Sequence, residues 1–389
     1  MKLLEPGVHF VTGNIAVAEA ALIAGCRFYA GYPITPSSDL MHHMARRMIE
    51  VGGVFIQAED EIAAINMVLG ASAAGMKAMT ATSGPGLSLM EEGLDLGFML
   101  ELPAVVVDVQ RVGPSTGIPT LGSQGDVMQA IWGSHGDKTR VVIAPSNVQE
   151  SFDLTIHAFN VAEMLRMPVI LLSDEFIAHS YGKLRVPTLD EISIVDRVRA
   201  DPSKHREPFR VDDAVPPFME PGRGFRAHYT GLIHDERGYP VIDREVTRKL
   251  LNRLVREKVA KYRNQVLRYE IYNPLSIDRA EAIIVAYGSI GSICKAVLRR
   301  TDLSRRALLF RPITLWPPPD RELIEAIDKF GASKVIVVEM NCGQYVHHVA
   351  SWVRDMEVSI RFVEFVPGFY PSINEMYRSI SKVMNGGKA

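Results

Sequence analysis

Residues 31–38 read Gly-Tyr-Pro-Ile-Thr-Pro-Ser-Ser, and they separate a short apolar run, residues 28–30, from an amphipathic run that predicts a helix. Pro33 and Pro36 each restrict φ to about −65° and disfavour the helical conformation in the residue before them. This pattern predicts that Thr35 is the N-cap of the helix and Pro36 its first residue. We therefore expect a stiff strand-to-helix connection, which is either an ordinary capped turn or a segment whose hydroxyl and free N–H groups bind an anion.

The segment 1–180 continues this alternation of short apolar runs and helical periodicity. Six runs predict strands, at residues 27–30, 54–56, 77–82, 104–109, 141–144 and 168–172. The runs 54–56 and 104–109 are predicted to be buried, and Asn14 and Asn147 are predicted to cap the helices 15–24 and 148–165. Strands alternating with helices indicate an α/β fold with a doubly wound parallel sheet and right-handed crossovers.

The chain of 389 residues is too long for one ordinary core, and its composition and hydrophobic pattern change twice along the sequence. Residues 181–273 are rich in proline and charge, and they predict a linker followed by one long charged helix, residues 243–269, with a solvated basic face. The alternation then resumes at residues 274–389, with strands expected at 282–286, 307–310, 334–339 and 360–363. The expected organisation is a first domain (1–180), a linker (181–273) and a smaller α/β domain (274–389).

Composition excludes several classes of protein. Lys and Arg number 43 against 45 Asp and Glu, so the net charge of -2 gives no basic field for nucleic acid. No apolar run approaches the roughly 20 residues that span a bilayer, and the first residues lack a secretory signal, so we expect a cytoplasmic protein. Cys26, Cys294 and Cys342 are too widely separated for a Cys-x-x-Cys site, so this chain is expected to bind no metal and no iron–sulfur cluster.

Ligands of open parallel sheets bind beyond the carboxyl ends of the strands. Four predicted strands end in polar segments there: residues 31–38, 59–61 and 83–86, and Arg111. Taken singly, a glutamate at a helix start or an arginine after a strand is more typical of an ordinary surface. Because all four segments meet at one edge, their combination favours a ligand site.

Four motifs in combination resemble the α subunit of the thiamine-diphosphate-dependent 2-oxoacid:ferredoxin oxidoreductases. They are YPITP (32–36), QAEDEIA (57–63), TSGPG (82–86) and QRVGPSTG (110–117). Three more, QGDVMQA (124–130), WGSHGD (132–137) and TGLIHDE (230–236), are similar to the 2-oxoglutarate branch of the family, also called 2-oxoglutarate synthase. The resemblance covers essentially the whole chain, and it implies a pyrimidine-type thiamine diphosphate domain followed by a transketolase-C-terminal-like domain.

The resemblance assigns roles to individual residues. Glu61 corresponds to the glutamate that bonds the aminopyrimidine ring and thereby promotes formation of the carbanion that attacks the 2-oxo group. Thr35 corresponds to the threonine that contacts the substrate's carboxyl and oxo oxygens, and Arg111 to the arginine that pairs with its carboxylate. The implied cofactor-binding residues are Glu61, Ser83, Gly84 and Pro85, and the implied substrate or coenzyme A loop is Tyr32, Pro33, Ile34, Thr35 and Pro36.

The resemblance also implies partner chains. Family members hold the diphosphate through a metal at a Gly-Asp-Gly segment, and here the segments 125–127 and 136–138 read Gly-Asp-Val and Gly-Asp-Lys. A β subunit is therefore expected to carry the diphosphate and its Mg²⁺. Iron–sulfur clusters are expected on the β or a ferredoxin-like subunit, and a γ-type subunit is expected as well.

The implied reaction converts 2-oxoglutarate, coenzyme A and oxidised ferredoxin to succinyl-CoA, carbon dioxide and reduced ferredoxin, or runs in reverse. Pyruvate or a branched-chain 2-oxoacid is an alternative substrate. In a different class of function, the chain is a non-catalytic scaffold subunit.

Overall fold

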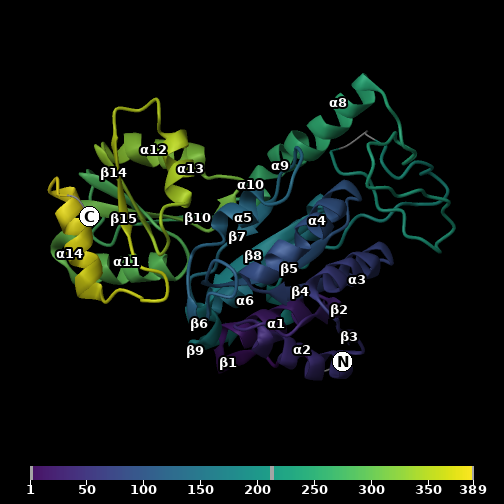
Figure 1. The fold of residues 1–389 in the computed structure, drawn as a ribbon, viewed down its shortest axis with the longest axis horizontal. Helices are drawn as coiled ribbons and strands as arrows, with labels where there is room; N and C mark the ends of the chain where they lie inside the picture. Colours follow the sequence, from purple (N-terminus) through teal and green to yellow (C-terminus); the bar gives the residue numbers. More distant parts are fainter. Residues whose placement is uncertain (1–2, 211–213, 388–389) are drawn as a thin grey trace.

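The computed structural model describes residues 3–210 and 214–387, which form two α/β lobes lying side by side (Figure 1). The larger sheet has the order β13-β7-β8-β5-β4-β2-β3, with β6 paired to β5. Its strands are β2 (Cys26–Gly31), β3 (Val54–Gln57), β4 (Lys77–Thr82), β5 (Ala104–Val112), β6 (Ile118–Gly122), β7 (Val141–Ile143), β8 (Pro168–Asp174) and β13 (Thr314–Trp316). Among these described strands, β6 and β13 pair antiparallel with their neighbours and the others pair parallel, so the predicted doubly wound parallel sheet is confirmed.

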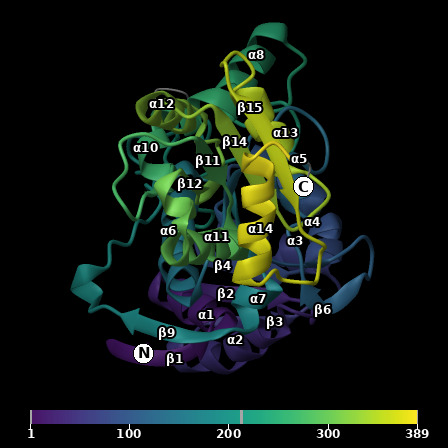
Figure 2. The ribbon, with the colours of Figure 1, turned by 90° about the vertical axis from the view of Figure 1, so that its left-hand side faces the viewer.

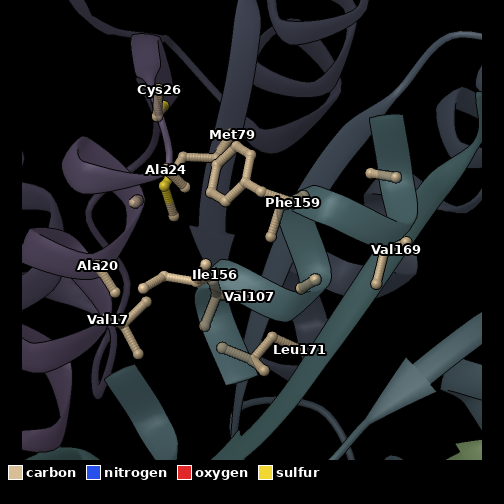
Figure 3. Packing of buried hydrophobic residues seen from close by; sticks show 14 of the residues in the cluster. Val17, Ala20, Ala24, Cys26, Met79, Val107, Ile156, Phe159, Val169 and Leu171 are labelled. Atoms are coloured by element: carbon tan, nitrogen blue, oxygen red, sulfur yellow. The ribbon is translucent and has the colours of Figure 1, made fainter. Parts of the chain in front are cut away.

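Helices cover both faces of this sheet. They are α1 (Gly13–Ile23), α2 (Ser38–Val51), α3 (Glu61–Ala73), α4 (Gly84–Met99), α5 (Val127–Trp132), α6 (Val148–Leu165) and α7 (Glu175–His179). Alternate strand residues point to opposite faces, so Met79 and Val107 pack with α1, α2 and α6. Figure 3 shows these two residues together with Phe159 of α6. Ala78 and Val106 pack on the other face with α3 and α4.

The second lobe has a five-stranded sheet of order β10-β12-β11-β14-β15, in which β10 is antiparallel and the other strands are parallel. Its strands are β10 (Tyr269–Tyr272), β11 (Ala282–Val285), β12 (Ala307–Pro312), β14 (Lys334–Glu339) and β15 (Ser359–Glu364). Its helices are α11 (Gly288–Arg300), η3 (Asp302–Arg305), α12 (Asp320–Phe330), α13 (Tyr345–Trp352) and α14 (Ile373–Met384). Strand β12 belongs to the sheet of the second lobe, but β13, which follows it directly, pairs with β7 in the sheet of the first lobe. The segment 307–316 therefore connects the two sheets.

Two strands outside these sheets have no counterpart in the expectations. Antiparallel β1 (Gly7–Thr12) and β9 (Tyr181–Val186) run along the base of the first lobe, as Figure 2 shows. A short 3-10 helix, η1 (Leu189–Glu191), follows. No helix among the described residues has the length and apolar character needed to cross a bilayer.

Two predicted helix caps are wrong. Helix α2 begins at Ser38 with Ser37 as its N-cap residue, so Thr35 does not cap it and Pro36 does not open it. The chain first closes a turn, in which the Ser37 N–H and hydroxyl both donate to the Ile34 carbonyl. Helix α1 is capped by the Thr12 hydroxyl, which accepts from the N–H of Ile15, and not by Asn14.

Asn14 has a different role. Its side chain is buried and donates a 2.9 Å hydrogen bond to the carbonyl oxygen of Pro36, so it ties helix α1 to the 31–38 segment. Asn147 caps α6 as predicted, with its side chain accepting from the N–H of Glu150. The predicted burial of the 54–56 strand is wrong, because β3 is the sheet edge and Val54 is 44% exposed.

The predicted long helix 243–269 is broken into four pieces. They are α8 (Arg244–Asn252), a π-helical turn η2 (Arg253–Glu257), α9 (Lys258–Lys261) and α10 (Arg263–Val266), and β10 follows. Its basic face is not wholly solvated, since Arg253 and Lys258 are fully buried against the carboxylate of Glu101. A buried carboxylate requires such partners, and Glu101 lies far away in the sequence.

Candidate active site

The carboxyl ends of the parallel strands bring three predicted residues into one neighbourhood. Arg111 is the second-to-last residue of β5, which continues to Val112 beyond the predicted strand 104–109, and it is only 7% exposed. Its Nη1 donates a 2.7 Å hydrogen bond to the carbonyl oxygen of Thr35, while its buried Nε has no hydrogen-bond partner in the described part of the chain. The guanidinium is therefore anchored on one side and keeps a donor for a ligand.

Glu61 is the first residue of α3, which Asp60 caps by accepting from the N–H of Ala63. Its side chain is 4% exposed, and burial raises the pKa of Glu61, with Asp60 adding to this shift and Arg111 opposing it. A Cβ atom on Gly86 would lie 2.4 Å from Glu61 Oε1, so only glycine fits there. Glu61 is thus held as a buried carboxyl whose pKa lies above its usual value.

A cavity of about 590 Å³ lies between the lobes, next to Arg111. The first lobe contributes Gly84, Pro85, Ser88, Arg111, Gly113, Pro114, Ser115, Ser123, Gly125, Asp126 and Gln129, and the second lobe contributes Asn341, Cys342, Gln344 and Pro367. Of the predicted site residues, the cavity wall holds Gly84, Pro85 and Arg111. Ser83 is fully buried and does not line the cavity, and Tyr32 is 39% exposed in the 31–38 segment.

The contribution of the second lobe was not predicted. Gln124 binds that lobe at several points: its N–H donates to the carbonyl of Met340, its Oε1 accepts from the Met340 N–H, and its Nε2 donates to the carbonyl of Tyr287. Gln344 Nε2 donates a 2.6 Å bond to the carbonyl of Gly125. These contacts fix the segment that carries Asp126, and nothing in the local sequence pattern announces partners in a lobe so much later in the chain.

Asp108 and Asp126 are also site residues that the predictions missed. Asp108 is fully buried, and its carboxyl group shares a side-chain hydrogen bond with that of Asp126, which lines the cavity. Burial raises the pKa of Asp108 well above its usual range, and the nearby Asp126 adds to the shift. Burial also raises the pKa of Asp126, to about 6. A visible signal existed, since Asp108 interrupts an apolar strand.

No group of three or more His, Cys, Asp or Glu side chains in the described part of the chain is arranged to hold a metal ion. Cys26 and Cys294 are buried, and Cys342 is exposed at the cavity.

Comparison with known families defines the class of this site. The family described as pyruvate flavodoxin/ferredoxin oxidoreductase, thiamine diphosphate-binding, matches residues 19–252. The family described as pyruvate:ferredoxin oxidoreductase core domain II matches residues 280–376. The site is therefore that of a thiamine diphosphate-binding chain.

Individual relatives narrow this assignment. The chain is 44% identical over 376 residues to the 2-oxoglutarate synthase subunit KorA of Methanocaldococcus jannaschii, covering 96% of this chain and 99% of the relative. It is 38% identical over 355 residues to the ketoisovalerate oxidoreductase subunit VorB of Methanothermobacter thermautotrophicus, covering 90% and 92%. The chain belongs to the 2-oxoacid:ferredoxin oxidoreductase family and is 42–44% identical to four 2-oxoglutarate synthase subunits KorA, so the resemblance drawn from its motifs is confirmed.

A solved structure gives the same result. The 2-oxoglutarate:ferredoxin oxidoreductase from Magnetococcus marinus, determined with 2-oxoglutarate, coenzyme A and succinyl-CoA bound, superimposes with a TM-score of 0.90 at 31% identity. The alignment covers 97% of this chain but 66% of that longer chain. The fold of both lobes is therefore that of this enzyme family.

Proposed function

We propose that this chain is the α subunit of a 2-oxoglutarate:ferredoxin oxidoreductase. The enzyme converts 2-oxoglutarate, coenzyme A and oxidised ferredoxin to succinyl-CoA, carbon dioxide and reduced ferredoxin, or catalyses the reverse. The observation that carries the proposal is the anchored Arg111 guanidinium at the inter-lobe cavity, in a chain 44% identical to a KorA subunit over nearly its whole length.

The residues around Glu61 fit thiamine diphosphate. A buried carboxyl with a raised pKa is suited to share a proton with a ring nitrogen, and the lack of a side chain at Gly86 leaves room for the Glu61 carboxyl beside α4. Ser83, Gly84 and Pro85 form the start of α4 and would make the wall beside the cofactor. When bound, thiamine diphosphate supplies the nucleophilic carbon that adds to the 2-oxo group.

Arg111 and the 31–38 segment suit the substrate. A guanidinium with one edge bound to the Thr35 carbonyl and its Nε free presents its remaining donors in a fixed direction, as carboxylate binding requires. In this arrangement Arg111 binds the C1 carboxylate that leaves as carbon dioxide. The Thr35 hydroxyl faces the oxo oxygen, and the neighbouring residues Tyr32, Pro33, Ile34 and Pro36 form the wall along which coenzyme A approaches.

We further infer that this chain forms half of a shared site. The segments 125–127 and 136–138 lack the second glycine of Gly-Asp-Gly, so a β subunit is proposed to bind the diphosphate and Mg²⁺. Iron–sulfur clusters on the β or a ferredoxin-like subunit would carry electrons to ferredoxin, with a γ-type subunit completing a cytoplasmic assembly.

The test is a substrate panel on the enzyme assembled from this chain and its partner subunits. Coenzyme A-dependent ferredoxin reduction is measured with 2-oxoglutarate, pyruvate and 2-oxoisovalerate. We expect the highest kcat/KM with 2-oxoglutarate. A preference for 2-oxoisovalerate would move the chain to the branch of VorB, and full activity of the partners without this chain would make it a scaffold.

A further inference from the structure

Three consecutive carbonyl oxygens in the 31–38 segment accept hydrogen bonds from three different parts of the chain. The acceptors are the carbonyl oxygens of Ile34, Thr35 and Pro36, and their donors are Ser37, Arg111 and Asn14, respectively. Ser37 belongs to the same turn, whereas Arg111 is in β5 and Asn14 is in α1. The proposed function uses the bond from Arg111 but gives no role to the bond from Asn14.

The bond from Asn14 lies inside the protein. Its Nδ2 donates to the Pro36 carbonyl oxygen at 2.9 Å, and Asn14 is only 1% exposed. Pro36 is buried as well. Both partners are shielded from solvent, so the bond is stronger than it would be in water and restrains the Pro36 carbonyl.

The donor of this bond is itself fixed. Asn14 is the second residue of α1, and the start of α1 packs directly on the backbone of α7, since a Cβ atom on Gly13 would lie 2.3 Å from the Ile177 carbonyl oxygen. Asp174 holds α7 in turn, because its carboxyl accepts from the N–H of Ile177 at 3.0 Å and from that of Ser289 in the second lobe at 3.3 Å. The Asn14 amide is therefore a fixed point that both lobes support.

The restraint on Pro36 extends to Thr35. The proline ring restricts φ to about −65°, so ψ is the one freely variable backbone dihedral of Pro36. The bond to its carbonyl oxygen restrains that dihedral, and the bond from Arg111 to the Thr35 carbonyl restrains the peptide before it. Thr35 is half-buried, so its side chain stays accessible. The direction of the Thr35 hydroxyl is therefore set by the bonds around it.

We propose that Asn14 is a positioning residue of the 2-oxoacid site: by holding the Pro36 carbonyl, it directs the Thr35 hydroxyl toward the oxo oxygen of the substrate. This inference rests on the proposed function, in which Thr35 and Arg111 face the oxo and carboxyl groups. Asn14 is buried and does not line the cavity, so it acts through the 31–38 segment. A displacement of a contacting group by about 1 Å costs on the order of a hundredfold in rate.

Asn14→Ala in the assembled enzyme removes the bond. We expect kcat/KM for the 2-oxoacid to fall on the order of tenfold to a hundredfold, mainly through kcat. Asn160→Ala is the matched control: the Asn160 amide also ties a helix to a distant carbonyl, that of Ser193 at 2.7 Å, but it is in α6 and does not line the cavity. Its kcat/KM should stay at the wild-type value. Equal kinetic losses in the two variants, or no loss in Asn14→Ala, would overturn the proposal.

A second substitution shows whether Asn14 acts through Thr35. Thr35→Val keeps the shape of the side chain and removes its hydroxyl. In that background Asn14→Ala should lower kcat much less than it does alone, because the group that it would misplace is absent. The same loss in both backgrounds would mean that Asn14 only supports the fold, and the positioning role would be wrong.

Asn14→Ser covers the case in which Asn14→Ala does not assemble with its partners. Serine keeps a hydroxyl donor but is too short to reach the Pro36 carbonyl directly. Its kcat/KM should therefore still fall, by less than that of the alanine variant. Wild-type kinetics in Asn14→Ser would show that the bond is dispensable and would refute the proposal.

Hydrogen exchange at the cofactor separates positioning from general damage to the site. The C2 hydrogen of bound thiamine diphosphate exchanges with deuterium in the absence of any 2-oxoacid, and in the proposed function this exchange depends on Glu61. Its rate, measured by NMR after acid quenching, should be the same in the Asn14 variants and the wild type. A parallel loss of exchange and turnover would overturn the proposal. An enzyme that uses another 2-oxoacid would instead refute the proposed substrate, and the same comparison would then be made with that acid.

Discussion

Two clusters of buried charge in this chain are built differently. At the junction of α4 with the linker, the carboxylate of Glu101 is bonded to Arg253 at 2.6 and 2.8 Å and also contacts Lys258, and all three side chains are fully buried. Near Arg111, by contrast, the carboxyl groups of Asp108 and Asp126 share a side-chain hydrogen bond with each other, and Asp126 lines the cavity.

The Glu101 cluster has a structural role, whereas the pair of Asp108 and Asp126 belongs to the candidate site. Burial by itself would raise the pKa of Glu101, but Arg253, Lys258 and Arg166 hold it well below its usual value, so this carboxylate stays ionised and fixes the linker. Burial raises the pKa of both Asp108 and Asp126, because no comparable set of cations in the described part of the chain opposes it. A buried carboxylate that is paired with cations holds the chain together, whereas a carboxyl pair without them keeps raised pKa values, as groups at functional sites often do.

The largest expected effect is on stability. Glu101→Gln leaves two buried cations without their anion, so the free energy of unfolding should fall by about 3–5 kcal/mol. Chemical denaturation of the purified chain measures it. Glu281→Gln is the matched control, because its pairs with Arg306 and Lys334 are partly exposed and should contribute less than about 1 kcal/mol. Equal losses in the two variants would remove the distinction between the Glu101 cluster and a surface pair.

Glu61→Gln should cause the largest loss of activity. The amide cannot exchange a proton with the cofactor, so kcat should fall on the order of a hundredfold to a thousandfold, with little change in unfolding. Glu59→Gln, two residues earlier and exposed, is the control. Near-normal turnover in Glu61→Gln would show that the proposed role of this carboxyl is wrong.

The location of the site could be predicted from the sequence, but the residues that complete it from distant parts of the chain could not. Strand–helix alternation put the 31–38 segment, Glu61 and Arg111 at one sheet edge, and the Arg111–Thr35 hydrogen bond shows that two of them touch. That inference succeeded because the carboxyl ends of parallel strands necessarily share an edge. Asp108, the one aspartate in an apolar strand, was equally visible in the sequence. Its partner Asp126 follows β6 in the chain, and no local pattern indicates that the two carboxyl groups meet.

The failures concern long-range contacts. Strand β13 is very short, and its partner β7 lies much earlier in the chain, so no local pattern predicts its transfer to the first sheet. The basic residues of the 243–269 segment look solvated on a helical projection. Arg253 and Lys258 are nevertheless buried, because they pair with Glu101, which lies far away in the sequence. Thr35 has the local chemistry of an N-cap, but the turn closed by Ser37 moves the start of the helix.

Arg111→Ala should lower kcat/KM for the 2-oxoacid on the order of tenfold to a hundredfold, mainly through KM, because a charged hydrogen bond to the substrate is lost. Steady-state kinetics of the assembled enzyme measures both constants, with Arg46→Ala on the exposed side of α2 as the control. An unchanged KM would show that another cation binds the carboxylate.

The smallest effect should come from Lys258→Met. Burial lowers the pKa of Lys258 to about 7, so near neutral pH its charge is only partly present, and Arg253 already satisfies both oxygens of Glu101. An apolar side chain of similar length can fill the same space, so the loss of stability should stay below about 2 kcal/mol, well under that of Glu101→Gln. Denaturation curves of the two variants, measured together, decide the point. A loss as large as that of Glu101→Gln would mean that the cluster needs both cations and that Lys258 stays charged in the folded chain.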